Sequence, residues 1–512
     1  LIKEALCERL NLYLFLFFFV FILIFLFFFS KRNDVFFKND NGVYEVSYDG
    51  NVFDLSYQNK VSSKIDALKS DKYTLENPLI IHNPYGIFSS SYYIYFSGEE
   101  SLLEYTVKTD GFNDFKRTVN SDYTKIKEFQ ICGLVAGYEN EVILKETYKD
   151  GSVNEKCFKI TLPESASDIQ IQIETSSDTE LSSGLFAVLG HDKNYNSNIY
   201  LYDNDGVLRN EIILDSYRAD RIVFDDGYMY FPYSKKGIAK VDSLGKIVNV
   251  YDLDNYSMHH DFILNDGKLL ILASLDGSGT IEDRVIEVDL ESKEVNELLN
   301  MQDVLLEFYE TAVNPGKNSY GNSSLDWIHL NSITVKDNDL ILSSRELSTI
   351  ICIGNYNSNY YVKYLLADED MTESTSYSDL LYEKESGFTS QAGQHSVSYY
   401  KEGSEYYLIM FNNNYGSIPT RSFVSFDHFP NVGSYGSGDS SYFYAYKVNE
   451  ETGTYDLVKS FALPYSSIVS SVQIYNGNIV TSSGKSNCFA EYDSDGNLLK
   501  EFKYNAKKYA YR

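Results

Sequence analysis

Residues 326–345, DWIHLNSITVKDNDLILSSR, have the pattern of a β-hairpin with unusual polar residues at its open end. Alternating apolar residues predict two strands with a tight polar turn between them, over Asn331–Val335, Leu340–Ser344 and Lys336–Asp339 respectively. In an antiparallel hairpin the start of the first strand and the end of the second lie at the same end. We therefore expect His329, Asn331 and Arg345 to face one mouth.

This hairpin belongs to a unit that recurs from about residue 166 onward. Each unit has a strand, a turn that usually carries Asp-Gly or Asn-Gly, a second strand, a third that often ends in Asp, and a fourth. The second to fourth strands recur six times, over 184–214, 227–253, 267–300, 339–366, 405–463 and 477–504. A four-stranded unit in about six copies predicts a β-propeller, with a β-solenoid or two stacked sandwiches as the alternatives. The long loops are typical of functional lids, over 301–325, 367–394 and 412–440.

Four first strands carry polar residues at matching distances from their turns, namely His260, Asn331, His395 and Ser470. Because the first strand of a propeller blade lines the central channel, these side chains are predicted to form a ring at one axial mouth. Four of the seven histidines in the chain, counting His259, fall in these segments. The alternative is a set of structural polar residues that bind water or close the channel by hydrogen bonds.

The predicted ring suits an anionic ligand. Arg345 offers a planar fork of donors, and the imidazoles and the Asn331 amide offer directed ones. A metal site is the rival, since histidine clusters bind Zn, Cu or Ni. Arg345 would repel a dication, however, and no Asp or Glu is expected in the ring because Asp261 should point to the other face of its strand. We therefore predict that no metal is bound.

The N-terminal half is predicted to hold a smaller β domain. Short alternating strands separated by turns form the pattern of a small β-sandwich, over Leu79–His82, Tyr92–Phe96, Leu102–Val107, Val142–Tyr148 and Cys157–Leu162. The polar spacer before it has two predicted strands and a predicted helix, over Gly42–Tyr48, Val52–Tyr57 and Asn59–Lys69. The predicted organisation is an N-terminal anchor, the spacer, the sandwich and the propeller, over residues 1–32, 33–74, 75–165 and 166–512.

The apolar run Leu12–Phe29 is unbroken over 18 residues, which is long enough to cross a bilayer. The core of a signal peptide covers roughly 7–15 residues and ends in small residues, whereas this run ends at Ser30-Lys31-Arg32. We therefore expect an uncleaved membrane anchor and an exported remainder. Basic residues on both sides of the run balance one another, so charge does not decide the orientation.

Composition restricts the partners. A net charge of −29 argues against nucleic acid, whose phosphates need a basic surface. No cofactor is predicted, and a homodimer is left open. The five cysteines form no CxxC motif, so a structural zinc site is not expected. Cys132 and Cys157 could pair in an oxidising compartment or remain two reduced, buried thiols.

Five separated motifs carry a family resemblance. In chain order they are NPLIIHNPYGIFSSSYYIYF, ICGLVAGYENEVIL, MHHDFILNDGKLLILAS, DWIHLNSITVKDNDLILSSRELSTI and GQHSVSYY. Over roughly residues 75–505 the chain resembles the bacterial aryl-sulfate sulfotransferases that use no nucleotide sulfate donor. The first two motifs resemble the family's immunoglobulin-like domain. With the anchor, this predicts an all-β chain: a membrane-anchor helix, a small immunoglobulin-like β-sandwich and a six-bladed β-propeller.

The resemblance implies an exported enzyme that moves a sulfuryl group from a phenolic sulfate ester to a phenol. His395 matches the family's sulfated histidine, which implies ping-pong transfer through a sulfohistidine. His260, His329, Asn331 and Arg345 match its sulfate-binding and acid/base positions, and strand register favours His260 over His259. Ser470 falls near a hydroxyl position of the family, although the local match is poor. A cysteine pair near the site of some members has no counterpart here.

Two function classes compete. In the first, His395 attacks sulfur, Arg345 and Asn331 hold the sulfuryl oxygens, and His260 or His329 moves the phenol proton. In the second, the chain is a surface-anchored propeller that binds an anionic ligand or a partner protein without turnover. A degenerate binder would be expected to lose the nucleophile, and the presence of His395 favours the enzyme.

Overall fold

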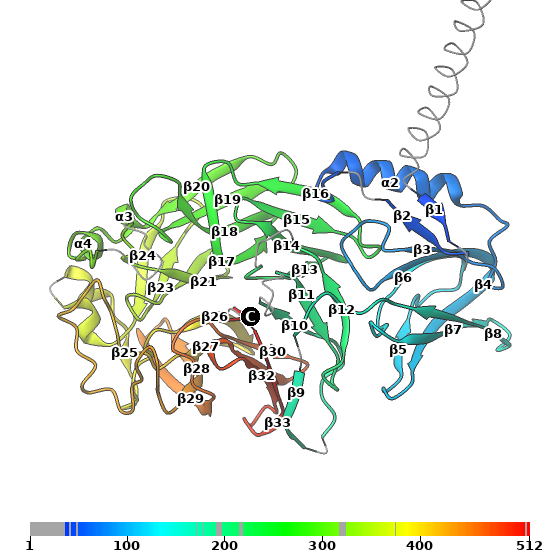
Figure 1. Cartoon of the computed structure of the whole chain (residues 1–512). Coiled ribbons are helices and arrows are strands. Elements are labelled where there is room, and N and C mark those ends of the chain that lie inside the picture. Colours follow the sequence, from blue (N-terminus) through cyan, green and yellow to red (C-terminus); the bar gives the residue numbers. More distant parts are fainter. Residues whose placement is uncertain are drawn as a thin grey trace, which may run out of the picture.

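The computed structural model describes residues 36–39, 42–47, 50–169, 171–177, 179–190, 197–214, 219–316, 324–373, 375–506 and 509–511. The predicted anchor Leu12–Phe29 lies outside these residues. Within the described part, no helix combines the length and the apolar character that crossing a bilayer requires. The described chain forms a ring of sheets with a smaller β domain at its side (Figure 1).

The smaller domain is organised by one long strand, β4 (Tyr92–Thr109). Its first half pairs with two strands and its second half with two others, with a register shift between Ser97 and Ser101. The remaining strands are β1 (Phe36–Lys38), β2 (Tyr44–Val46), β3 (Leu79–His82), β5 (Phe115–Thr118), β6 (Thr124–Ile131), β7 (Glu139–Tyr148) and β8 (Val153–Thr161). The alternating apolar residues of β4 line one core, which includes Leu103 and Val107.

Helix α2 (Leu55–Leu68) accounts for the predicted helix over Asn59–Lys69. The predicted strand over Val52–Tyr57 is wrong. The Asp54 side chain accepts a hydrogen bond from the Ser56 N–H, and this N-cap starts the helix inside the apolar-alternating stretch.

Six sheets make up the ring, which confirms the predicted six-bladed propeller and the immunoglobulin-like domain before it. The first blade is β10 (Phe186–Leu189), β11 (Ile199–Tyr202) and β12 (Leu208–Ile212). The second is β13 (Val223–Asp225), β14 (Tyr228–Ser234), β15 (Gly237–Val241) and β16 (Ile247–Asp252). The third is β17 (Tyr256–Asn265), β18 (Lys268–Leu275), β19 (Arg284–Asp289) and β20 (Val295–Asn300). The fourth is β21 (Leu330–Lys336), β22 (Asp339–Ser344), β23 (Thr349–Gly354) and β24 (Tyr361–Leu366).

The fifth blade is β26 (His395–Glu402), β27 (Glu405–Asn412), β28 (Ser441–Asn449) and β29 (Thr454–Leu463), with β25 (Glu383–Lys384) at its edge. The sixth is β30 (Ser471–Tyr475), β31 (Asn478–Ser483), β32 (Cys488–Tyr492) and β33 (Leu498–Tyr504). Strand β9 (Ile171–Ser176), which precedes the first blade in sequence, pairs with β33. The ring is thereby closed by non-adjacent parts of the chain, which protects a sheet edge.

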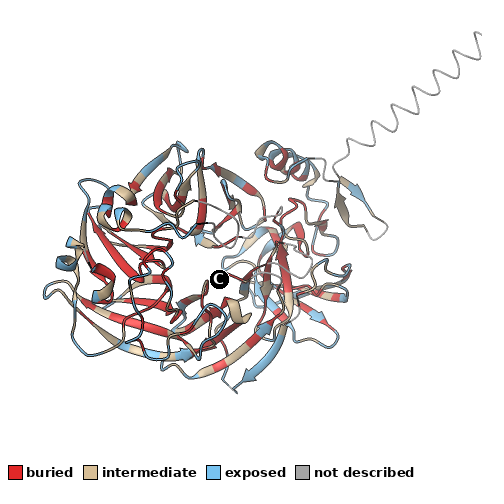
Figure 2. Ribbon diagram, turned by 60° about the vertical axis from the view of Figure 1, so that its left-hand side comes forward, coloured by how far each residue is buried: buried red, intermediate tan, exposed pale blue. Residues whose placement is uncertain are grey.

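The blades bury their faces against one another (Figure 2). Every residue of β23 is buried, because a strand inside a blade has a neighbouring blade on each face. Such strands therefore have the continuous apolar runs seen in TIICIG. The edge of the first blade is covered by the smaller domain, where the Ile213 N–H donates to the carbonyl of Ile87.

The first two long loops carry short helical turns, and all three long loops pack together. The helical turns are α3 (Met301–Val304), α4 (Leu306–Glu310), η1 (Glu369–Thr372) and η2 (Ser376–Leu380). A small core joins the second and third loops, formed by Ala367, Met371, Ala392, Ile418, Phe426 and Phe429. The buried Arg421 guanidinium donates to the carbonyl of Phe308, which ties the third loop to the first. A lid role for these loops stays a prediction.

Cys132 and Cys157 are free thiols in this structure. The Cys132 thiol contacts the Tyr105 hydroxyl at 3.2 Å, and the Cys157 thiol donates to Glu141 at 3.1 Å. Cys157 is exposed, so the alternative of two buried thiols is also wrong for that residue.

Candidate functional site

The axial ends of the inner strands have irregular backbone, and this irregularity directs the site residues. Strand β17 shifts register between Met258 and Phe262, and His260 within the shift has a φ of +60°. His329, just before β21, has a φ of +50°, and Asn331 lies in the register shift that follows. L-residues with bulky side chains rarely adopt positive φ, and such strain concentrates at functional sites.

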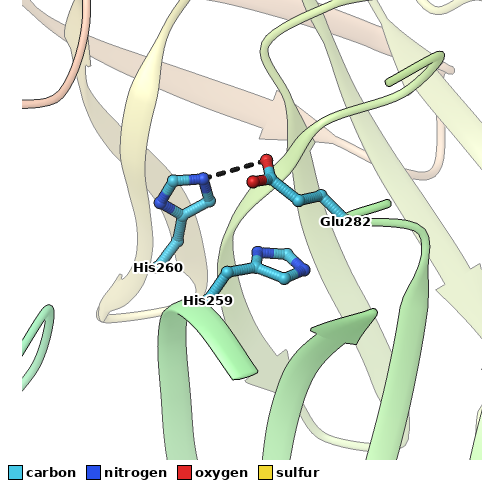
Figure 3. A group of neighbouring side chains, drawn as sticks. All are labelled: His259, His260 and Glu282. Atoms are coloured by element: carbon cyan, nitrogen blue, oxygen red, sulfur yellow. Dashed lines mark hydrogen bonds and ion pairs between the residues drawn. The ribbon is translucent and has the colours of Figure 1, made fainter. Parts of the chain in front are cut away.

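His260 and His329 meet, as the ring hypothesis predicts. Their Nε2 atoms are 3.1 Å apart, and the His329 main chain is held beside Arg345, whose N–H donates to the His329 carbonyl at 3.1 Å. Glu282 contacts both imidazoles, with one oxygen 3.0 Å from His260 Nε2 and 2.6 Å from His329 Nδ1. Figure 3 shows its contact with His260 and the position of His259 beside them. His259 lies beside this pair but contacts His260 edge to face, at 5.0 Å between ring centroids.

The charges of this cluster are set by its burial and its carboxylates. Burial and the neighbouring Arg345 charge oppose protonation of His329, but Asp326 and Glu282 outweigh them and raise its pKa to about 9. The Asp326 carboxylate is 2.7 Å from His329 Nδ1. Burial opposes ionisation of Glu282, yet the surrounding histidines hold its pKa well below the usual range. His329 is therefore an imidazolium at neutral pH, between two carboxylates.

His259 has the opposite character. Burial lowers its pKa to about 4, so it is neutral at pH 7. Of the two adjacent histidines, His260 is the one that contacts Glu282 and His329. The irregular backbone accompanies this difference, because His260 lies in the register shift of β17 with a φ of +60°.

The expectation that no acidic residue enters the ring is wrong. Glu282 reaches it from the connection between β18 and β19, and Asp326 from just before β21. Among the described residues, two groups have metal-compatible spacing there, His259 with His260 and Glu282, and His329 with Glu282 and Asp326. A third group, away from the ring, joins Asp368, Asp370 and His428.

The charge balance disfavours a dication at the ring. Glu282 and Asp326 already face two cations, the His329 imidazolium and Arg345, whose Nη2 lies 3.4 Å from Asp326. Binding a metal ion would require His329 to lose its proton and would place the ion beside the guanidinium. The prediction that no metal is bound therefore rests on electrostatics, since carboxylates are present, and it stays a prediction.

Arg345 is held from one side only. Its Nη2 contacts Asp326 and, at 3.1 Å, Glu346. The buried Glu346 carboxylate also accepts from the Thr420 N–H and hydroxyl, which connects Arg345 to the third long loop. No described residue bonds to Arg345 Nε or Nη1, and the side chain is 21% exposed. Two sets of donors are therefore free to bind an oxyanion.

Asn331 is fully buried and donates one amide N–H to the carbonyl of Gln394 at 2.7 Å. An amide nitrogen has two hydrogens, so a second remains for a ligand. The contact also places Asn331 next to His395, the residue that follows Gln394.

His395 is 1% exposed, and its tautomer follows from its contacts. Nδ1 lies 3.0 Å from the Gly393 carbonyl and 2.8 Å from Asn413 Oδ1. Because a carbonyl can only accept, Nδ1 carries the proton and Nε2 carries the lone pair. Burial lowers the pKa of His395 well below its ordinary value, the neighbouring His260, His329 and Arg345 act in the same direction, and the Asn413 contact opposes the shift. No described residue bonds to Nε2, which leaves it available as a nucleophile.

Asn413 is the residue that positions His395, and sequence reasoning missed it. Its Nδ2 donates to the carbonyls of Ser466 and Val469 at 2.7 and 3.0 Å, which fixes Oδ1 toward the imidazole. Asn413 follows the end of β27 by one residue, as Arg345 follows β22. The hairpin rule that identified Arg345 could therefore have found it.

Ser470 is not brought into contact with the histidines. Its hydroxyl donates to Ser466 Oγ at 2.8 Å and accepts from the Gly484 N–H at 3.0 Å. It therefore braces the segment whose carbonyls hold Asn413. Its φ of +91° shows that the chain turns sharply before β30.

Two protein-family models match this chain. A family model described as arylsulfotransferase (ASST) matches residues 170–512, and a model of the arylsulfotransferase Ig-like domain matches residues 79–163. A search of curated proteins finds no match.

Similar solved structures are remote. Apo AztD from Citrobacter koseri is 9% identical with a TM-score of 0.29, and the alignment covers 80% of this chain and 99% of that one. An auxiliary nutrient binding protein from Bacteroides ovatus is 10% identical with a TM-score of 0.32, covering 82% and 86%. A chain of the nidogen/laminin complex is 10% identical with a TM-score of 0.34, covering 63% and 98%. Scores this low carry no argument about function.

Proposed function

The chain belongs to the arylsulfotransferase family, and from this premise we propose that it moves a sulfuryl group from a phenolic sulfate ester to a phenol through a sulfohistidine at His395. The observation that carries the proposal is the contact of His395 Nδ1–H with Gly393 and Asn413, which leaves a lone pair on Nε2. That lone pair belongs to a buried neutral imidazole, which is a competent nucleophile near pH 7.

In the first half-reaction, His395 Nε2 forms a bond to sulfur while the bond from sulfur to the phenolic oxygen breaks. The departing phenolate takes a proton from the His329 imidazolium, whose charge Glu282 and Asp326 maintain. The free donors of Arg345 and the second Asn331 N–H bind the sulfuryl oxygens, where negative charge builds up in the transition state.

The second half-reaction runs the same steps backward with a new phenol. The acceptor hydroxyl gives its proton to the neutral His329, either directly or through His260, whose Nε2 is 3.1 Å away. The phenolic oxygen then bonds to sulfur, and the electron pair of the broken N–S bond returns to His395 Nε2. No cofactor takes part in either step.

Steady-state kinetics test this scheme. With an aryl sulfate that releases a coloured phenolate, we expect release to require an added phenol, and initial-rate lines at several phenol concentrations to be parallel. Intersecting lines would contradict a covalent intermediate, and release without phenol would indicate a sulfatase. No release under any condition would favour the non-catalytic binder.

The pH dependence is predicted to follow His329. Its pKa of about 9 means that the acid form predominates at pH 7 and is lost as the pH rises through that value. Donor kcat/KM should therefore fall about tenfold per pH unit above pH 9. In His329→Gln, which cannot titrate, that decline should vanish from an already slower reaction. A wild-type profile that stays flat or rises through pH 9 would remove His329 from the acid role.

We also propose that the enzyme works outside the cytoplasm on small phenols and phenolic sulfates, anchored by Leu12–Phe29. The support is the apolar run of 18 residues. Extraction of cell membranes at alkaline pH tests the anchor, since an embedded chain stays in the pellet and a peripheral one is released.

A further inference from the structure

The C-terminal end of the chain lies at the centre of the ring of blades (Figures 1 and 2). Tyr511 stacks on the His260 ring, with 4.7 Å between centroids and 22° between planes. Its other neighbour is His395, which it meets edge to face at 5.9 Å. Tyr511 is only 1% exposed, so its phenol ring is enclosed within the site.

The segment that carries Tyr511 packs against the first and last blades. The Tyr511 N–H donates to the carbonyl of Leu189 at 3.1 Å, and Ala510 packs in the core shared by these blades. Gly484 makes room for it, because a Cβ there would lie 2.1 Å from the Ala510 carbonyl oxygen. The Gly484 N–H is in turn held by Ser470.

An acceptor phenol has to reach two groups at once, the sulfuryl-bearing His395 and the base formed by His260 and His329. Tyr511 is a phenol that already contacts both sides of this gap. A substrate ring and the Tyr511 ring cannot occupy the same volume, since protein interiors are close-packed.

We propose, on the basis of the function proposed above, that Tyr511 is an internal mimic of the acceptor: its ring fills the place of the substrate phenol and has to leave before the phenol binds. The contact is then autoinhibitory. When a site is open for only a fraction of the time, the apparent dissociation constant of its ligand rises by the inverse of that fraction. Removing the plug should therefore tighten binding of phenols.

Binding of 4-nitrophenol to the full chain, measured by calorimetry without any sulfate donor, tests the proposal. Tyr511→Ala should lower Kd by about tenfold, the value for a site that is open one-tenth of the time. Gly484→Ala should do the same by unseating Ala510, without changing Tyr511 itself. Tyr511→Phe keeps the ring and should have the wild-type Kd. Tyr360→Ala, which removes an exposed tyrosine about 150 residues before Tyr511 in the sequence, should also have the wild-type Kd.

Turnover measurements show whether the phenol that binds is the one that reacts. In Tyr511→Ala the KM for the phenol should fall in parallel with Kd while kcat is maintained. An unchanged or higher Kd in both Tyr511→Ala and Gly484→Ala overturns the proposal, and so does a lower Kd with an unchanged KM. If wild type and all variants lack phenol-dependent release, the transferase proposal fails, and the Kd comparison alone still decides whether Tyr511 occupies a phenol site.

Discussion

His395→Ala is expected to abolish sulfuryl transfer, with a loss of about 10⁴-fold or more in kcat, the scale seen when a covalent nucleophile is removed. The reason is that His395 has an unprotonated Nε2 because two acceptors hold its Nδ1–H. No other described residue of the site has this arrangement. Incubation of the wild type with an aryl sulfate and no phenol should add one sulfuryl group to the peptide that contains His395. Mass spectrometry of an alkaline digest detects it, and the variant should show none.

A matched control is available in the smaller domain. His82 lies at the end of β3, where it contacts Glu45 and the Ser89 carbonyl far from the axis of the ring. His82→Ala should keep both the turnover and the covalent adduct. If His395→Ala retains transfer within tenfold of wild type, or if the sulfuryl group is found on another residue, the assignment of the nucleophile is wrong.

The second large effect is expected at Arg345. Loss of a donor aimed at charge that develops in the transition state typically costs about 10²–10³-fold in kcat, so Arg345→Met should lose about this factor. Arg345→Lys should recover only part of the loss. A guanidinium can contact Glu346 through one nitrogen while its other nitrogens bind the substrate, and an ammonium lacks this planar set of donors. Single-turnover rates of phenolate release measure the effect on the chemical step.

Arg117→Met, in the smaller domain where the guanidinium lies over Phe115, is the matched control and should react at the wild-type rate. Because Arg345 also contacts Asp326, the variant should in addition raise the pKa of His329, whose protonation that guanidinium opposes. An Arg345→Met enzyme with normal single-turnover rates would contradict a role in binding the sulfuryl oxygens.

The hairpin at residues 326–345 shows how much of the structure the pattern of side chains predicts. Strands β21 and β22 differ from the predicted strands by one residue at three of their four ends. The fourth end, Ser344, is the predicted one. Antiparallel pairing places Arg345 at the same end of the hairpin as His329, and the register shift at Asn331 then brings the Arg345 N–H opposite the His329 carbonyl. The same local rule, applied to β27, would also have identified Asn413.

Glu282 marks the limit of that rule. It has a φ of +59° and lies between two strands rather than at the end of a hairpin, so neither periodicity nor register predicts its direction. Ser470 shows the opposite case. It lies at the strand position that the register predicts, but the sharp turn at Val469 and Ser470 directs its hydroxyl toward Ser466 and Gly484 instead of the histidines.

The sequence by itself determined the repeat, the six blades and which strands line the axis, because apolar alternation and turn residues act between near neighbours in the chain. Only the tertiary structure decided the charge and the occupancy of the site. Glu282 and Asp326 make an imidazolium of His329, Asn413 fixes the tautomer of His395, and Tyr511 fills the gap between the histidines. The contact of Glu282 with His329 joins two neighbouring blades, and Tyr511 reaches the histidines from the C-terminal segment, so both depend on packing between parts of the chain that local pattern does not relate.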